Sequence, residues 1–267
     1  MNTRTLVQFG VALALVFGSP SVALAADAGH SSHGGLGKPL PPGWEPAVHD
    51  RTINTFTLFE KAEFRTGEMA DAAVFDAQGW IGGDFQRFWW KAEGEQLTEG
   101  ARAGEIEVQA LYSRLFSPFW DVQAGVRVDR SYSGPERETR GHLVIALEGL
   151  APYWFEIEPA LFISDKGKVS FSFAGSYDLL LTQRLVLQPR VDLRLDAERQ
   201  DSAPSILGEG VNDLDVGLRL RYDIRRQFSP YIGVEWHRAI GATAGLTRRA
   251  GKDLSRTAVV FGLRTWF

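Results

Sequence analysis

The sequence predicts an all-β fold, a transmembrane antiparallel up-and-down β-barrel of about twelve strands. Three observations lead to this prediction. Segments of about ten residues alternate apolar and polar side chains, which is the period of a strand and a suitable length for a tilted bilayer crossing. Short turns alternate with longer polar loops along the chain. The polar face of the strands carries both carboxylates and arginines, as a water-filled lumen does.

The alternation is easiest to follow in residues 105–129. On both sides of a central turn the even positions are apolar, whereas the odd positions are polar or small apart from Leu111. Pro118 lies within this turn, at 115–119, and cannot donate a ladder hydrogen bond, so the strand breaks there. The two runs predict a β-hairpin with one apolar face and one charged face.

The same alternation predicts the remaining strands. In the first of them Phe56, Leu58, Ala62 and Phe64 are expected on one face, which Glu60 interrupts. The expected strands lie at residues 52–65, 72–81, 85–95, 140–149, 153–163, 168–179, 184–196, 212–224, 230–238 and 255–267.

Loop lengths predict the orientation of the barrel. Short turns are expected after the even-numbered strands, and longer loops, including 197–211 and 239–254, after the odd-numbered ones. An even number of strands places both termini on the short-turn rim, which is periplasmic in outer-membrane barrels. Aromatic residues crowd these turns and are expected to form an interfacial girdle: Phe116, Phe119, Trp120, Tyr153, Trp154, Phe228 and Tyr231.

A soluble β-sandwich is the alternative fold, in which the apolar face would be core and the charged face solvated. Strands of about ten residues are long for a sandwich. The alternating loop lengths and the mixed charges of the polar face also favour the barrel over the sandwich.

The N-terminus has the features of a secretory signal peptide. Arg4 provides the positive region, and the apolar stretch 6–17 is too short to span a bilayer as a helix, which disfavours a retained anchor. The small-residue site 23–25 predicts cleavage after Ala25 or Ala26. The predicted organisation is a signal peptide at 1–25, a flexible, disordered periplasmic tail at 26–51 and the barrel at 52–267.

Composition excludes several classes of protein. The chain has no cysteine, so neither disulfides nor thiolate sites are available. A net charge of −4 is too mild to suggest a nucleic-acid partner. No G-x-S-x-G, H-E-x-x-H or phosphate-binding glycine loop is present, so we do not expect an enzyme.

Several longer motifs resemble the outer-membrane copper resistance protein B family. The resemblance extends over about residues 52–267 without a large gap. Its motifs are DAQGWIGGD at 76–84, LYSR at 111–114, GLAPYWFE at 149–156, YDLLLTQR at 177–184, LQPR at 187–190, LRLRYDIRR at 218–226 and PYIGV at 230–234.

The resemblance implies an outer-membrane protein of a copper resistance system, surrounded by lipid and usually found with a periplasmic multicopper oxidase. It also implies copper as a bound ion and an N-terminal region rich in Met and His. This chain departs from that pattern, because its tail contains His30, His33 and His49 but no methionine. Imidazole suits Cu(II) and other divalent ions, whereas thioethers suit Cu(I).

The candidate metal ligands fall into two groups. In the tail, His30 and His33 could reach one ion and His49 could add a ligand, although a solvated linker with incidental histidines is equally compatible with this composition. In the barrel, His142, His237 and Glu235 are expected to face the lumen. They are accompanied there by Asp76, Glu93, Glu105, Glu107, Asp121, Glu156 and Glu158, and by Arg87, Arg127, Arg190, Arg194, Arg219 and Arg221.

A lumen lined by carboxylates favours cations, but mixed charges in a narrow barrel also form salt bridges that fill the interior. Met69 is expected in a surface loop and is a poor ligand by itself. We therefore predict an outer-membrane barrel that binds copper and sequesters it or passes it across the membrane. The alternatives are a metal-free docking partner for a periplasmic multicopper oxidase, or a general small-solute pore.

Overall fold

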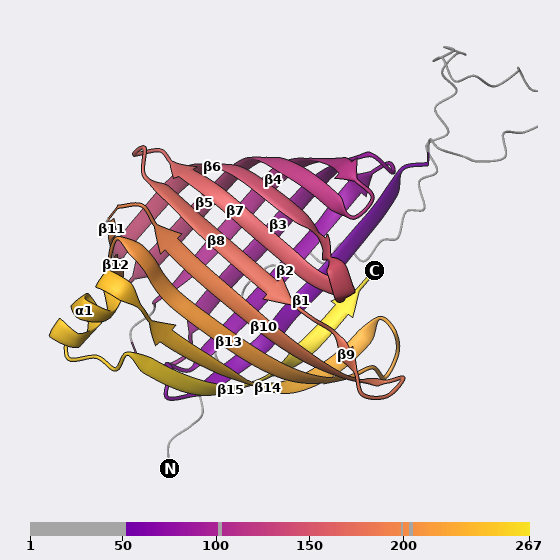
Figure 1. Cartoon of the computed structure of the whole chain (residues 1–267). Helices are drawn as coiled ribbons and strands as arrows, with labels where there is room; N and C mark the ends of the chain where they lie inside the picture. The colour runs from indigo at the N-terminus through magenta and orange to yellow at the C-terminus, as the bar shows by residue number, and fades with distance from the viewer. Residues whose placement is uncertain (1–51, 101–102, 199, 203–204) are drawn as a thin grey trace, which may run out of the picture. The chain divides into compact units, whose positions relative to one another are not determined.

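The structure is a computed structural model that describes residues 52–100, 103–198, 200–202 and 205–267. The predicted signal peptide and tail lie outside these residues. The described chain forms a closed antiparallel barrel of 12 strands, as predicted. Each strand pairs with its neighbour in sequence, and pairing of the last strand with the first closes the sheet (Figure 1).

Every predicted strand coincides with a barrel strand, with bounds that differ by a few residues. The barrel strands are β1 (Asn54–Gly67), β2 (Ala72–Gly82), β3 (Gln86–Leu97), β4 (Ala103–Ser117), β5 (Trp120–Ser133), β6 (Glu136–Ala151), β7 (Phe155–Ser164), β8 (Val169–Ser176), β10 (Leu185–Asp196), β13 (Gly210–Tyr222), β14 (Phe228–Ala239) and β15 (Ser255–Trp266).

Five small elements lie in the connections. The 3-10 turn η1 (Pro152–Trp154) precedes β7, and the two-residue strand β9 (Leu179–Leu180) pairs with β10. The hairpin β11 (Gln200–Ser202) and β12 (Ser205–Leu207) follows β10, and the helix α1 (Gly241–Arg249) follows β14. No helix in the described part of the chain is long and apolar enough to cross a bilayer.

The predicted alternation of loop lengths is only partly correct. β5 and β6 are joined by residues 134–135 alone, on the rim where long loops were expected. Gly134 has a φ of +60°, which permits such a tight hairpin turn. On the opposite rim, residues 177–184 form a longer connection that contains β9.

The predicted faces of β1 are wrong because of a β-bulge at Glu60. Phe59 pairs with Ala77 and Lys61 with Asp76, so Glu60 has no partner on β2. One inserted residue moves every later side chain to the opposite face. Leu58 is therefore buried on the inner side, whereas Ala62 and Phe64 lie on the outer side.

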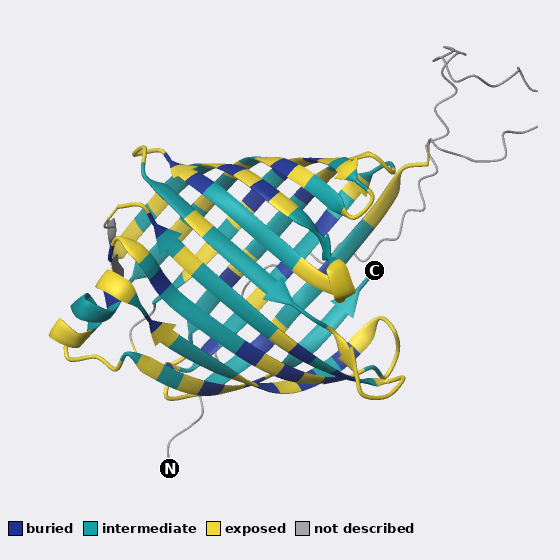
Figure 2. Ribbon diagram, in the orientation of Figure 1, coloured by how far each residue is buried: buried dark blue, intermediate teal, exposed yellow. Residues whose placement is uncertain are grey.

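The outer surface is apolar, and exposed and buried positions alternate along the strands (Figure 2). Exposed apolar patches of this extent are rare on soluble proteins and are typical of a lipid-facing surface. Together with the closed sheet, this excludes the sandwich. Most of the predicted girdle is exposed at the rim that carries the termini, but Tyr231 is a correction: it is buried and faces the lumen.

Candidate functional site

The lumen contains a cavity of about 900 Å³ on the side of α1. Residues of α1 and of the loops between β1 and β2 and between β14 and β15 form its outer part. Lys91, Glu158 and Arg190 line it toward the middle of the barrel, whereas Glu60, Asp76 and Glu148 lie beyond its lining. We call this cavity the vestibule. Charged side chains line its inner end, toward the middle of the barrel, which we call its floor.

Lys91 bridges distant parts of the barrel wall. Its Nζ donates to Glu158 on β7 at 2.8 Å and lies 3.0 Å from Glu148 on β6. Gln123 on β5 donates to the same oxygen of Glu148 at 2.8 Å. The Lys91 side chain is only 12% exposed, so its ammonium is held firmly between two carboxylates.

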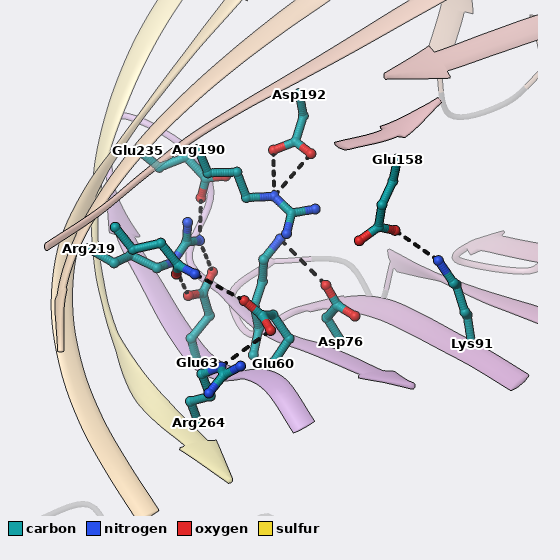
Figure 3. Close-up of polar contacts among 12 residues, drawn as sticks. Glu60, Glu63, Asp76, Lys91, Glu158, Arg190, Asp192, Arg219, Glu235 and Arg264 are labelled. Atoms are coloured by element: carbon teal, nitrogen blue, oxygen red, sulfur yellow. Dashed lines mark hydrogen bonds and ion pairs between the residues drawn. The ribbon is translucent and has the colours of Figure 1, made fainter. Parts of the chain in front are cut away.

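Arg190 enters the lumen from β10. Its Nε donates to both oxygens of Asp192, at 3.1 and 2.9 Å, and its guanidinium lies in the lumen (Figure 3). Nearby, Glu60 lies 3.3 Å from Nε of Arg264 and accepts from Gln188 at 3.4 Å. Arg190 and Lys91 thus approach the middle of the lumen from different walls.

The wall where the barrel closes holds a buried cluster. Arg219 on β13 donates two hydrogen bonds to Glu63 on β1, at 3.0 and 3.2 Å, and the Tyr231 hydroxyl donates to Glu63 at 2.9 Å. The side chains of Arg219 and Glu63 are 5% and 1% exposed. Glycines on the surrounding strands provide the space for these side chains.

The next wall along the sheet, formed by β2 to β5, carries a row of acidic side chains. Asp76 pairs in register with Glu93, Glu93 with Glu107, and Glu107 with Asp129, on four consecutive strands. Arg127 lies 2.6 Å from Glu107 and 2.5 Å from Asp129. Glu93 forms no hydrogen bond or ion pair with any described residue. We call these four acidic residues the carboxylate row.

The predicted barrel ligands fall in two places. His237 and Glu235 both line the vestibule, where His237 Nδ1 lies 2.7 Å from Asp215 and Nε2 lies 3.7 Å from Asp213. His142 lies 3.1 Å from Asp129 and lines a second cavity of about 260 Å³, which adjoins the vestibule and shares Glu93, Glu107 and Arg127 with its lining. The structure therefore does not bring the two histidines together, and His30, His33 and His49 lie outside the described residues.

Met69 is a correction. It was expected on the surface, but it is 7% exposed and lines the vestibule. The loop between β1 and β2 is held by Glu68, whose backbone N–H donates to the Thr257 carbonyl at 2.9 Å and whose side chain accepts from the Thr257 N–H at 2.8 Å. Met69 thereby places a thioether in the same cavity as His237.

Comparison with known proteins connects this barrel to copper. A family profile described as "Copper resistance protein B precursor (CopB)" matches residues 53–267. The chain belongs to the copper resistance protein B family. It is 37% identical to copper resistance protein B of Escherichia coli over 221 residues, covering 83% of this chain and 72% of the relative. It is 38% identical to the copper resistance protein B homolog of Pseudomonas syringae pv. tomato over 220 residues, covering 82% and 72%.

Solved structures agree on the fold. The NanC porin aligns with a TM-score of 0.51 and 13% identity, covering 79% of this chain and 99% of that protein. At this identity the likeness concerns the outer-membrane-type barrel fold alone. The copper resistance protein B family is named for copper resistance and not for an enzymatic activity.

The donors in the lumen of this copper resistance protein B family member are dispersed. Among the residues that the structure describes, no three His, Cys, Asp or Glu side chains are grouped so that they could hold a metal ion. The vestibule nevertheless contains an imidazole, a thioether and several carboxylates. Sequence reasoning missed Met69, Glu60, Glu63 and Lys91 as components of the site. Only the interruption of the apolar face by Glu60 was a visible signal.

Proposed function

We propose that this chain passes copper ions across the outer membrane through the lumen of its barrel. The observation that carries the proposal is the vestibule, where Met69, His237 and Glu235 face one water-accessible cavity within a membrane barrel. Thioether and imidazole are both copper ligands, whereas carboxylates attract cations generally. Copper here is the transported ion and not a resident cofactor.

Dispersed donors support passage more than storage. An ion that is to leave a pore must bind at several weak sites and not at one strong site. Sequestration would require a compact ligand set, and the described barrel residues contain no such set of His, Cys and acidic side chains. We assign any tight capture of copper to His30, His33 and His49 of the proposed periplasmic tail.

The orientation follows from the proposed signal peptide at 1–25. Export through it, together with an even number of strands, supports a periplasmic position for both termini and the tail at 26–51. The vestibule and α1 then face the outside of the cell. We propose no catalytic role for the chain.

The test is copper entry into proteoliposomes that enclose a fluorescent copper chelator. We expect His237→Ala and Met69→Leu each to slow entry by about threefold or more, because each removes a ligand from the vestibule. His142→Ala is the matched control, since His142 lines the other cavity. Equal entry by all the variants and the wild type would contradict this path.

Two further measurements separate the alternatives. Titration of the mature protein with Cu(I) and Cu(II), beside a variant with His30, His33 and His49 changed to Ala, tests capture by the tail. Swelling of proteoliposomes in sugar solutions tests the general solute pore, which predicts swelling without copper preference.

One observation favours the docking alternative. Tyr153 and Trp154 have φ values of +69° and +68° and are 83% and 72% exposed. Left-handed backbone is unfavourable for such bulky residues and often marks a functional site. We propose this pair as the contact for a periplasmic multicopper oxidase. Retention of the oxidase by the wild type but not by a Tyr153→Ala/Trp154→Ala variant, in a pull-down without copper, would support docking.

A further inference from the structure

Among the described residues, Lys91 differs from the other lumenal cations in the distance that its contacts span around the barrel. Three strands separate β3, which carries Lys91, from β7, which carries Glu158. The guanidinium of Arg190 on β10 also reaches into the lumen, where it is held by Asp192 of its own strand (Figure 3). The contacts of Lys91 therefore cross the lumen and do not follow the wall.

Lys61 provides the contrast within the same lumen. It pairs with Asp76 at 3.8 Å, and the two residues lie directly opposite each other on the adjacent strands β1 and β2. This contact runs along the wall and leaves the lumen free. A barrel of more than about eight strands has an interior wider than wall side chains fill, so only side chains that cross it can close it.

The contacts of Lys91 also resemble a cation site. Glu148 and Glu158 hold its ammonium from two strands, and Gln123 fixes the orientation of Glu148. These carboxylate oxygens are the groups that a permeating cation would use in a selective pore. Lys91 is in effect a tethered cation at the floor of the vestibule.

We propose that Lys91 forms a crossbar that closes the lumen, with the Arg190 guanidinium projecting into the same space, and that these two cations determine which ions pass. A permeating ion must take the carboxylates from these side chains. A divalent ion neutralises the charges of two carboxylates at once. A monovalent ion neutralises no more charge than the side-chain cation that it displaces. The crossbar therefore selects divalent cations, and among copper ions Cu(II). This inference rests on the proposed passage of copper and adds the residues that control it.

The test is conductance in planar bilayers and copper entry into proteoliposomes, for the wild type, Lys91→Met and Lys91→Met/Arg190→Met. We expect low K⁺ conductance in the wild type and a rise of about threefold or more in each variant, because removing a crossbar opens the lumen. The preference for Cu(II) over K⁺ should fall in the same order.

Lys61→Met is the matched control. It removes the same charge from the same lumen, but its contact does not cross it. An equal rise in Lys61→Met and Lys91→Met would overturn the crossbar, because net charge alone would then explain the effect. Glu158→Gln is the second variant should Lys91→Met fail to fold. It keeps the lysine and removes its anchor across the lumen, and unchanged K⁺ conductance there would also overturn the proposal.

The outcomes separate this inference from the proposed function. If K⁺ conductance rises in Lys91→Met but no variant and no wild type admits copper, the crossbar is supported and copper passage is wrong. If copper enters equally in all variants while K⁺ conductance stays low, copper passage is supported and the crossbar is overturned.

Discussion

The two walls of the lumen differ in how they accommodate charged side chains. On the closing wall, Arg219, Glu63 and Tyr231 bond to one another and are almost completely buried. On the other wall, the carboxylate row places like charges directly opposite each other on adjacent strands, and Glu93 has no partner among the described residues. Like charges in register destabilise a sheet. The difference agrees with a closing wall that stabilises the fold and a carboxylate row that serves the proposed passage of ions.

Three glycines explain how the closing wall accommodates so large a cluster. A Cβ at Gly262 would lie 2.7 Å from the Glu63 Cβ and from the Tyr231 hydroxyl. A Cβ at Gly233 or Gly217 would lie within 2.9 Å of the Arg219 side chain. The carboxylate row has no such enclosure and lies beside the cavities of the lumen.

The largest expected effect comes from breaking the closing wall. Arg219→Met leaves Glu63 buried without its charged partner, which should cost about 3–5 kcal/mol of unfolding free energy. Urea unfolding of the barrel in lipid, followed by tryptophan fluorescence, measures this. The double variant Arg219→Met/Glu63→Gln should recover part of the loss, because it removes the unpaired charge. A loss below about 1 kcal/mol in the single variant would mean that the pair behaves as an exposed one.

A smaller effect is expected from filling the glycine space. Gly262→Ala forces its methyl group against Glu63, Tyr231 and the Ala62 carbonyl, which should cost about 1–3 kcal/mol. Gly141→Ala on β6 is the matched control, since a Cβ there meets nothing within 4 Å. Equal unfolding free energies for the two variants would show that the closing wall can accommodate an additional methyl group.

Sequence alone predicted much of this contrast. Strict alternation placed Arg219, Glu93, Glu107 and His237 in the lumen, and the even strand number placed the start of the first strand and the end of the last strand on one rim. The bulge at Glu60 was not predictable, because an interruption of the pattern does not distinguish an inserted residue from a lumenal charge. Neither was the burial of Met69, which depends on how a four-residue loop folds inward.

The partners of the lumenal charges could not be predicted from the sequence either. Lys91 and Glu158 are 67 residues apart, and their contact depends on the strand number and stagger of the closed barrel. The cluster around Glu63 joins residues up to 168 positions apart. Alternation predicts which face a side chain occupies, but only closure of the sheet determines which side chain it meets.

The smallest effect on stability, and the sharpest test of the contrast, is expected for Glu93→Gln. This change removes the central charge of the carboxylate row without changing its shape, and it relieves repulsion from Asp76 and Glu107. We expect unfolding free energy to rise by about 0.2–1 kcal/mol, whereas Glu63→Gln should lower it.

Copper entry into proteoliposomes should move in the opposite direction to stability, because Glu93→Gln weakens the attraction of the lumen for cations. A variant that is more stable and slower to admit copper would identify the row as a site where stability is given up for ion passage. Loss of stability in Glu93→Gln would instead mean that the cations near the row need this carboxylate, and that both walls serve the fold.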